Sequence, residues 1–191
     1  MHGFERKLYK KRKYLLSKLE GHVIGVGEGT GINFQFYPED IHIHAVEPSK
    51  PMLEKARIKA VGNSNITFYN KDINDVALNE HFKEKSIDAV ICTLVLCTIP
   101  DPIKALQNFK KWLKPNGKLI ILEHIHASKP ANKKLQNFIN PVWKVFGEGC
   151  HLNRNTDLLI KEAGFTPILE EYFMRTLRFY SGVFKLGENH R

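Results

Sequence analysis

A cluster of closely spaced glycines follows the first short apolar segment of the chain. It spans residues 25–31 and reads Gly-Val-Gly-Glu-Gly-Thr-Gly. Glycines allow a tight turn and let a ligand approach the main chain, and the free N–H groups of a following helix favour an anionic group. Glu47 stands twenty residues after Gly27, where a carboxylate can accept hydrogen bonds from ribose hydroxyls. Loop and acid together indicate an adenosine-binding site.

The glycine spacing differs from two common nucleotide-binding motifs. The dinucleotide pattern Gly-x-Gly-x-x-Gly fails, because the sixth position is Thr30 counted from Gly25 and Ile32 counted from Gly27. The P-loop fails because no Gly-Lys-Ser/Thr follows. The missing dinucleotide pattern makes an NAD-dependent dehydrogenase one of the weaker hypotheses for this chain. A further alternative is that the glycines serve only a turn between a strand and a helix.

Candidate acid–base residues lie in the second half of the chain. His124 directly follows the apolar segment 118–122, and histidine titrates near neutral pH. A structural histidine bonded to the backbone is the alternative for this position. Cys150, His151 and Arg154 lie between two helical patterns, in a segment that either covers an acceptor or forms an ordinary connecting loop.

The elements that must position these residues alternate along the chain. Apolar segments predict strands at 22–26, 41–46, 65–69, 86–96 and 118–122. Periodic patterns predict helices at 30–37, 50–60, 102–113, 131–145 and 154–163. A Lys-Pro-Asn-Gly turn is expected at 114–117, and a hairpin of two strands within 166–185. Strands separated by helices predict a doubly wound α/β sheet, mostly parallel, with right-handed crossovers.

Length and composition limit the class of protein. The 191 residues suit a single domain of ordinary size. The longest weakly polar run, Ala89–Pro100, is 12 residues and is too short to span a bilayer, which takes about 20. Three cysteines without a Cys-x-x-Cys, and the lack of a signal sequence, favour a cytoplasmic protein.

The net charge of +9 is concentrated at the N-terminus. Residues 1–20 hold seven basic and two acidic residues, a balance of +5. Phe4, Leu8, Leu15 and Leu19 share one stripe of a predicted amphipathic helix. We expect this helix to pack on the domain formed by residues 21–191 with a solvated basic face. The alternative is a non-catalytic binder of anionic surfaces or nucleic acid that works through this helix.

Several segments resemble the motifs of class I S-adenosylmethionine (SAM)-dependent methyltransferases, and the likeness covers nearly the whole chain. The segments are Val23–Gly31 (motif I), Ala45–Ser49 (motif II), Asn70–Ile73, Ile87–Leu94 (motif IV) and Leu113–Leu119. The resemblance implies a Rossmann-like fold with a mostly parallel seven-stranded sheet and a C-terminal antiparallel hairpin. It implies SAM as methyl donor, with S-adenosylhomocysteine as product. The donor-binding residues it implies are Gly25, Gly27, Glu28, Gly29, Gly31, Glu47, Pro48, Met52, Asp72, Ile73 and Thr93.

Three further stretches are similar to the group of this superfamily that methylates alkyl thiols. They are Gly31–Pro38, Cys92–Cys97 and Glu148–Arg154. A small-molecule thiol acceptor is expected, with His124, Cys150 and Arg154 as the candidate catalytic residues. Free thiols are a few per cent thiolate at pH 7 and need little activation. Methylation of a quinone precursor or a phospholipid amine is the alternative, by likeness to more distant relatives.

One position departs from the family pattern. Gly25 stands where the family has an acid that helps to hold the ammonium group of the donor, and Glu28 is the candidate substitute. Nucleic acid is not an expected partner, because base-modifying enzymes have Asp/Asn-Pro-Pro-aromatic where this chain reads Cys92-Thr-Leu-Val. The thiol-methylating group has a hydrophobic segment ahead of this domain. We expect this chain to have no transmembrane segment and at most a weak peripheral contact with an anionic membrane.

No metal site is expected from the histidine pairs. His42 and His44 form one His-x-His pair, and His124 and His126 form another. In the sheet order of this family the two strands are three spacings apart, about 14 Å, so the two pairs cannot share an ion. Cys92 and Cys97 are expected to be small core residues.

Overall fold

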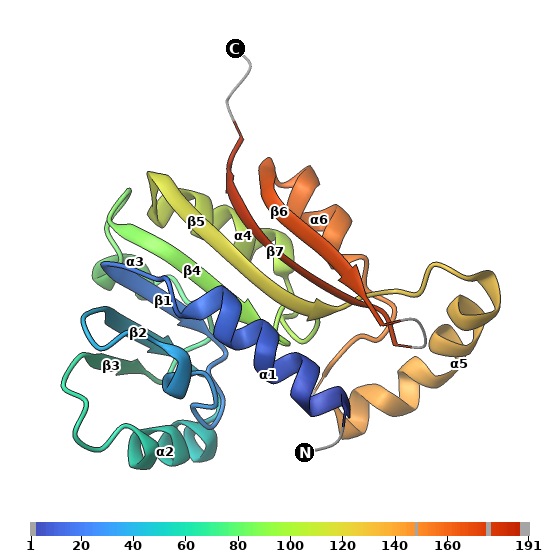
Figure 1. The fold of residues 1–191 in the computed structure, drawn as a ribbon, viewed down its shortest axis with the longest axis horizontal. Helices are drawn as coiled ribbons and strands as arrows, with labels where there is room; N and C mark the ends of the chain where they lie inside the picture. The colour runs from blue at the N-terminus through green and yellow to red at the C-terminus, as the bar shows by residue number, and fades with distance from the viewer. Residues whose placement is uncertain (1–2, 148, 175–176, 188–191) are drawn as a thin grey trace.

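The computed structural model describes residues 3–147, 149–174 and 177–187. Seven strands form one sheet in the order β3-β2-β1-β4-β5-β7-β6 (Figure 1). Strands β1 to β5 run parallel to their neighbours in this group, whereas β7 is antiparallel to both β5 and β6. The predicted doubly wound fold with its C-terminal antiparallel hairpin is therefore confirmed. The strands are β1 (His22–Val26), β2 (His42–Val46), β3 (Ile66–Tyr69), β4 (Ile87–Thr93), β5 (Leu113–His124), β6 (Phe165–Phe173) and β7 (Phe179–Leu186).

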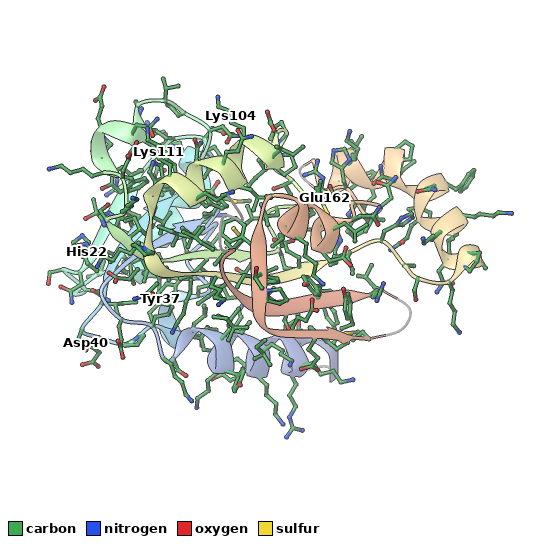
Figure 2. All side chains as sticks on the ribbon, turned by 90° about the horizontal axis from the view of Figure 1, so that it is seen from above. His22, Tyr37, Asp40, Lys104, Lys111 and Glu162 are labelled. Carbon is green, nitrogen blue, oxygen red and sulfur yellow. The ribbon has the colours of Figure 1, made fainter. Side chains whose placement is uncertain are left out.

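Helices cover both faces of the sheet. Figures 1 and 2 show α1 on one face, with α4 and α6 on the other. The helices are α1 (Gly3–Leu16), α2 (Lys50–Lys59), α3 (Leu78–His81), α4 (Pro102–Trp112), α5 (Pro130–Phe146) and α6 (Thr156–Glu162), with a short 3₁₀ helix η1 (Phe34–Phe36). Asp101 caps α4 by accepting a hydrogen bond from the Lys104 amide, and Pro102 fits the first turn because it has no N–H to satisfy.

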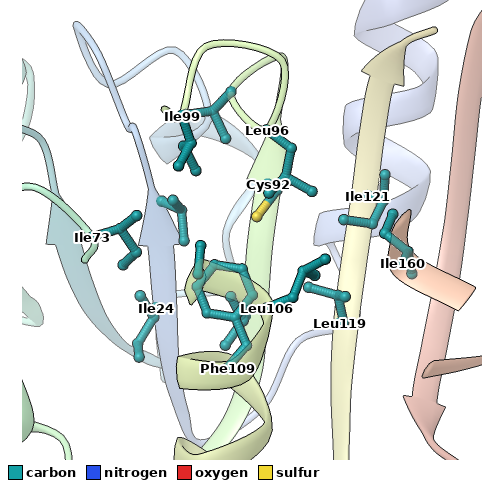
Figure 3. Packing of buried hydrophobic residues seen from close by; sticks show 14 of the residues in the cluster. Ile24, Ile73, Cys92, Leu96, Ile99, Leu106, Phe109, Leu119, Ile121 and Ile160 are labelled. Carbon is teal, nitrogen blue, oxygen red and sulfur yellow. The ribbon is translucent and has the colours of Figure 1, made fainter. Parts of the chain in front are cut away.

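Alternate residues of the strands form two core layers, because successive side chains point to opposite faces. On one face, Ile24, Cys92 and Ile121 pack with Leu106 and Phe109 of α4 (Figure 3). The opposite layer joins the strand residues Ile91 and Leu122 to Leu8, Leu15 and Leu16 of α1. The sheet is thus held rigid between both layers, and its carboxyl edge is free to form a site.

Two predicted elements are wrong in extent. The helix predicted over 30–37 is only η1, because Gly31 takes a left-handed backbone (φ 75°) and the loop before it turns. The fourth strand ends at Thr93 rather than at residue 96, since Leu94 also has a positive φ of 58°. Both differences place a turn, rather than a regular element, next to the carboxyl edge of the sheet.

The remaining predicted elements match within a few residues, with two additions. The expected turn at 114–117 is a bulge inside β5, between the pairs Ile87–Leu113 and Ala89–Lys118. The short helix α3 was not predicted. Among the described residues, no helix combines the length and the apolar character needed to cross a bilayer.

Candidate active site

A cavity of about 610 Å³ lies at the carboxyl ends of β1, β2, β4 and β5. This is where doubly wound sheets bind their ligands, and the volume suits a small-molecule site. Seven of the predicted donor-binding residues line it: Gly27, Gly29, Glu47, Pro48, Met52, Asp72 and Ile73. His124 and Cys150 line it as well, together with Trp143 and Gly147 at the end of α5.

The Glu47 carboxylate is held at the cavity wall by two backbone amides. The amide of Gly29 donates to Oε2 at 2.9 Å, and the amide of Ser49 donates to Oε1 at 2.8 Å. The loop is also packed tightly, because a Cβ at Gly27 would lie 2.2 Å from Val95 Cγ2, and φ there is 58°. The glycine loop, β2 and the loop after β4 therefore form one preorganised wall.

Glu28 does not line the cavity but lies beneath the glycine loop. A Cβ built at Gly25 would come within 1.8 Å of Glu28 Oε1. The carboxylate of residue 28 thus occupies the space that a side chain at position 25 would fill. The Tyr37 hydroxyl donates to Oε1 at 2.5 Å, and Asn33 Nδ2 donates to Oε2 at 3.4 Å. Burial raises the pKa of Glu28 to about 7, against the opposing hydrogen bonds.

A buried polar network extends from Glu28 to the N-terminal helix. Asn33 Nδ2 also donates to Thr93 Oγ1 at 2.9 Å, and Arg12 Nε donates to Asn33 Oδ1 at 3.1 Å. Sequence reasoning missed Arg12, Asn33 and Tyr37 as members of the site. Asn33 and Tyr37 fall within the stretch 31–38 that carried part of the family resemblance, which was the available signal. Thr93, which is expected to bind the donor, does not line the cavity, and its hydroxyl accepts the hydrogen bond from Asn33.

Three side chains converge at the other end of the cavity. His124 Nε2 lies 2.8 Å from Cys150 Sγ, and Cys150 Sγ lies 3.6 Å from Cys97 Sγ. The hydrogen bond with Cys97 lowers the pKa of the Cys150 thiol; burial opposes this shift, and the hydrogen bond and charge interaction with His124 add to it. Burial alone would lower the pKa of His124, but its hydrogen bond and charge interaction with Cys150 outweigh this and raise it. The pair therefore favours a thiolate beside an imidazolium.

Two charged residues fix the loops around this cluster. Glu123 Oε1 accepts hydrogen bonds from the amides of Val95 (2.7 Å) and Leu96 (2.8 Å). Arg154 Nη1 donates to the carbonyl oxygens of Leu96 (2.5 Å) and Ile99 (2.7 Å). Arg154, one of the three predicted catalytic residues, does not line the cavity. Its guanidinium binds backbone carbonyl oxygens, so Arg154 positions the loop and does not contact a ligand in the cavity.

The remaining predicted residues lie away from the cavity wall. Gly31 has φ 75°, and a Cβ there would lie 2.6 Å from Phe34 Cε2, so this glycine shapes the loop. Gly25 lies inside β1, where it leaves room for Glu28. Glu148, at the start of one stretch that carried the resemblance, falls outside the described residues.

The converging side chains are also of metal-ligand types. The ligand atoms of Cys97, His124 and Cys150 lie within 4.8 Å of one another, and two sulfurs with one imidazole suit a soft divalent cation. The sequence predicts no metal site, because the two His-x-His pairs are far apart and no cysteine or carboxylate spacing indicates a ligand set. His42 and His44 lie instead beside His22, with ring centroids 5.2 and 5.7 Å from it. His22 and His42 begin β1 and β2, at the opposite edge of the sheet.

Comparisons with known proteins agree with this geometry. A family model described as a methyltransferase domain matches residues 24–121. A thiol S-methyltransferase of Rattus norvegicus is 35% identical over 179 residues, which span 87% of this chain and 72% of that protein. A human thiol S-methyltransferase is 33% identical, with the same coverage. A solved structure of a putative methyltransferase from Bacillus halodurans superposes with a TM-score of 0.70 at 20% identity, covering 88% and 72% of the two chains.

The family match spans half of the chain and includes the glycine loop, Glu47 and Asp72. The protein belongs to the class I SAM-dependent methyltransferases and is an enzyme of that class. Its methyl donor is therefore S-adenosylmethionine, and its acceptor is a small molecule. The solved structure, at its low sequence identity, supports the fold alone.

Proposed function

We propose that the methyl acceptor is a small-molecule thiol. The observation that carries this proposal is the apposition of His124 Nε2 and Cys150 Sγ, 2.8 Å apart, on the wall of the donor cavity. The imidazolium of this pair stabilises the thiolate form of an incoming thiol, which gives its proton to solvent. The similarity to thiol S-methyltransferases of rat and human supports the same acceptor.

The donor fits the residues at the opposite end of the cavity. Glu47, fixed by two amides, has oxygen lone pairs left for ribose hydroxyls. Asp72 and Ile73 border the space next to it and would hold the adenine, and Met52 of α2 and Pro48 just before that helix close it. Glu28 places a carboxylate where the family has its acid, beneath the loop that would hold the methionine ammonium. When bound, SAM supplies a methyl group on a sulfonium, which needs an aligned acceptor more than acid–base help.

On the acceptor side the chain stabilises a negative charge. The acceptor thiol loses its S–H proton to solvent, and the imidazolium of His124 stabilises the resulting thiolate until its sulfur takes the methyl group. Arg154 and Glu123 hold the loop of Val95 to Ile99 in place against this pair. A weakly acidic amine acceptor would gain nothing from such a pair, which is why a thiol is favoured over a phospholipid amine.

Methyl transfer from labelled SAM to aliphatic thiols, phenols and ethanolamine derivatives tests the acceptor. We expect thiols to be methylated, and Cys150→Ser and His124→Asn to lower kcat/KM by about 10²-fold, as when one group that stabilises a reacting anion is removed. The affinity for S-adenosylhomocysteine should change less than about threefold, because donor binding uses the other end of the cavity.

His81→Asn is the matched control, since His81 is an exposed histidine of α3 that does not line the cavity. Methylation of amines or phenols but not thiols would overturn the proposal. So would unchanged thiol kinetics in both variants. Treatment with a chelator in parallel shows whether an ion at Cys97, His124 and Cys150 takes part.

A further inference from the structure

Helix α5 turns a polar edge toward the rest of the molecule. Gln136 is buried, and its Oε1 accepts a hydrogen bond from the Ala127 amide at 2.7 Å. Asn140 Oδ1 accepts from the Leu152 amide at 2.8 Å, and Asn137 Oδ1 accepts from Asn153 Nδ2 at 3.0 Å. A helix of a globular protein normally buries its apolar face and exposes its polar one. The orientation of α5 is the reverse.

The apolar side chains of α5 face away from the protein. They recur at helical spacing and are largely exposed: Leu135 56%, Phe138 82%, Val142 61%, Val145 78% and Phe146 81%. The helix projects beyond the end of the sheet in both views (Figures 1 and 2). No described segment of the chain covers this edge, so the edge is open to a partner.

The charges around α5 identify the chemistry of that partner. Lys129, Lys133, Lys134 and Lys144 are exposed, and residues 124–147 contain no aspartate or glutamate. An apolar edge with lysines on the remaining surface is the pattern of a helix that lies in an anionic membrane interface. A second copy of this chain fits less well, because pairing two α5 edges would bring eight lysines of like charge together.

We propose that α5 docks the protein on an anionic lipid surface, with Phe138, Val142 and Phe146 entering the apolar boundary. Trp143 and Gly147 of the same segment line the cavity, so docking places the mouth of the cavity against the lipid. This inference rests on the proposed thiol acceptor: in this orientation the enzyme selects apolar thiols that partition into the bilayer. It differs from an anchor at the N-terminus, because α1 buries its own apolar stripe in the core.

Vesicle flotation with the full chain tests the docking. We expect binding to phosphatidylcholine vesicles that contain 30% phosphatidylserine and weak binding to phosphatidylcholine alone. The variant Phe138→Glu/Phe146→Glu should bind at least tenfold more weakly. Its control, Ile58→Glu/Val61→Glu, makes the same charge change at equally exposed apolar residues (72% and 83%) on α2 and just after it, and should lose less than threefold.

Two further readouts separate the outcomes. Of the two tryptophans, Trp112 is fully buried and Trp143 is partly exposed, so a blue shift of tryptophan emission on adding vesicles reports lipid next to Trp143 at the mouth of the cavity. Binding of S-adenosylhomocysteine is measured in every variant, so that loss of the donor site is not mistaken for loss of docking. Equal flotation of both variants overturns the proposal. A dimer in sedimentation that the α5 variant abolishes, without any vesicle binding, also overturns it and assigns the edge to a second copy.

Discussion

At position 25 the absence of a side chain leaves room for the side chain of Glu28. The Glu28 carboxylate fills the volume that any residue larger than glycine would need there, and Tyr37 and Asn33 fix it by hydrogen bonds. The departure from the family pattern at Gly25 is therefore paired with the acid at residue 28. Glycine is needed at position 25 because the Glu28 carboxylate lies there, and that carboxylate fits only because position 25 has no side chain.

This pairing predicts a strong coupling between two substitutions. Gly25→Ala should lower the free energy of unfolding by about 2–3 kcal/mol, because its Cβ overlaps Glu28 Oε1. In a Glu28→Ala background the same change should be far less harmful, giving a coupling energy above about 1 kcal/mol in a double-mutant cycle measured by urea unfolding. Gly3→Ala, where a Cβ meets nothing within 4 Å, is the control. Additive effects would show that Glu28 does not occupy this space.

A second prediction at the residue scale concerns the ribose acid. Glu47→Gln should weaken binding of S-adenosylhomocysteine about 10- to 100-fold, since hydrogen bonds to a charged group contribute about 1.5–3 kcal/mol. Isothermal titration calorimetry measures the change. Glu54→Gln, an exposed residue of α2, should leave the affinity unchanged. A loss below threefold for Glu47→Gln would mean that this carboxylate only holds the loop.

At the scale of elements, the paired starts of β1 and β2 place titratable groups together. His44 on β2 packs against His42, His22 and Phe82, and its Nδ1 lies 3.1 Å from the Tyr69 hydroxyl. Burial, reinforced by the neighbouring histidines, lowers the pKa of His44 to about 4. The unfolded chain therefore takes up a proton here near pH 6.5, and the folded chain only near pH 4.

This difference predicts a pH-dependent contribution of His44 to stability. It is fully present above pH 6.5 and is lost as the pH falls toward 4, because protons then bind preferentially to the unfolded state. Relative to His44→Phe, the wild type should lose about 2 kcal/mol of unfolding free energy between pH 7.5 and pH 5. Urea unfolding at the two pH values measures it, and a constant difference between the two proteins would refute it.

The comparison with a variant is necessary because Glu28 changes the free energy of unfolding with pH in the opposite direction to His44. Its pKa is raised to about 7 by burial, so its contribution is present below about pH 4.5 and is lost as the pH rises through 7. Between pH 5 and 7 the two residues largely cancel in the wild type. The pH profile of the wild type alone would hide both effects.

At the scale of the whole molecule, α1 is part of the fold rather than an appendage. Leu8, Leu15 and Leu16 belong to the core layer on one face of the sheet, and Arg12 reaches the polar network under the glycine loop. Its exposed lysines lie on the solvent side, as expected for a packed amphipathic helix. Deleting residues 1–20 would therefore disturb the donor loop together with any surface contact.

A single substitution tests this more cleanly than a deletion. Leu16→Ala should lower the free energy of unfolding by about 3 kcal/mol, since Leu16 is fully buried and the change leaves a cavity. Lys10→Ala on the exposed face should stay within about 0.5 kcal/mol. Chemical denaturation of both variants measures the difference. A small effect of Leu16→Ala would show that α1 is only loosely docked.

The sequence by itself determined the parts of this protein that depend on local pattern. The apolar segments, the glycine loop at 25–31 and the spaced acid Glu47 predicted the sheet and the donor end of the cavity. These signals are readable because strand burial and the reach of a βα turn depend on neighbours within about twenty residues. The helix expected at 30–37 failed for a related reason, since the glycine that shapes the loop also prevents the helix.

Only the tertiary structure decided how distant segments meet. Cys97, His124 and Cys150 come from two loops and the end of a strand, and their spacing along the sequence does not predict that they cluster. The same is true of Arg12 beneath the glycine loop and of α5, whose apolar edge turns outward because Gln136 and Asn140 bond the protein body. Such contacts depend on the packing of whole elements, which local periodicity does not specify.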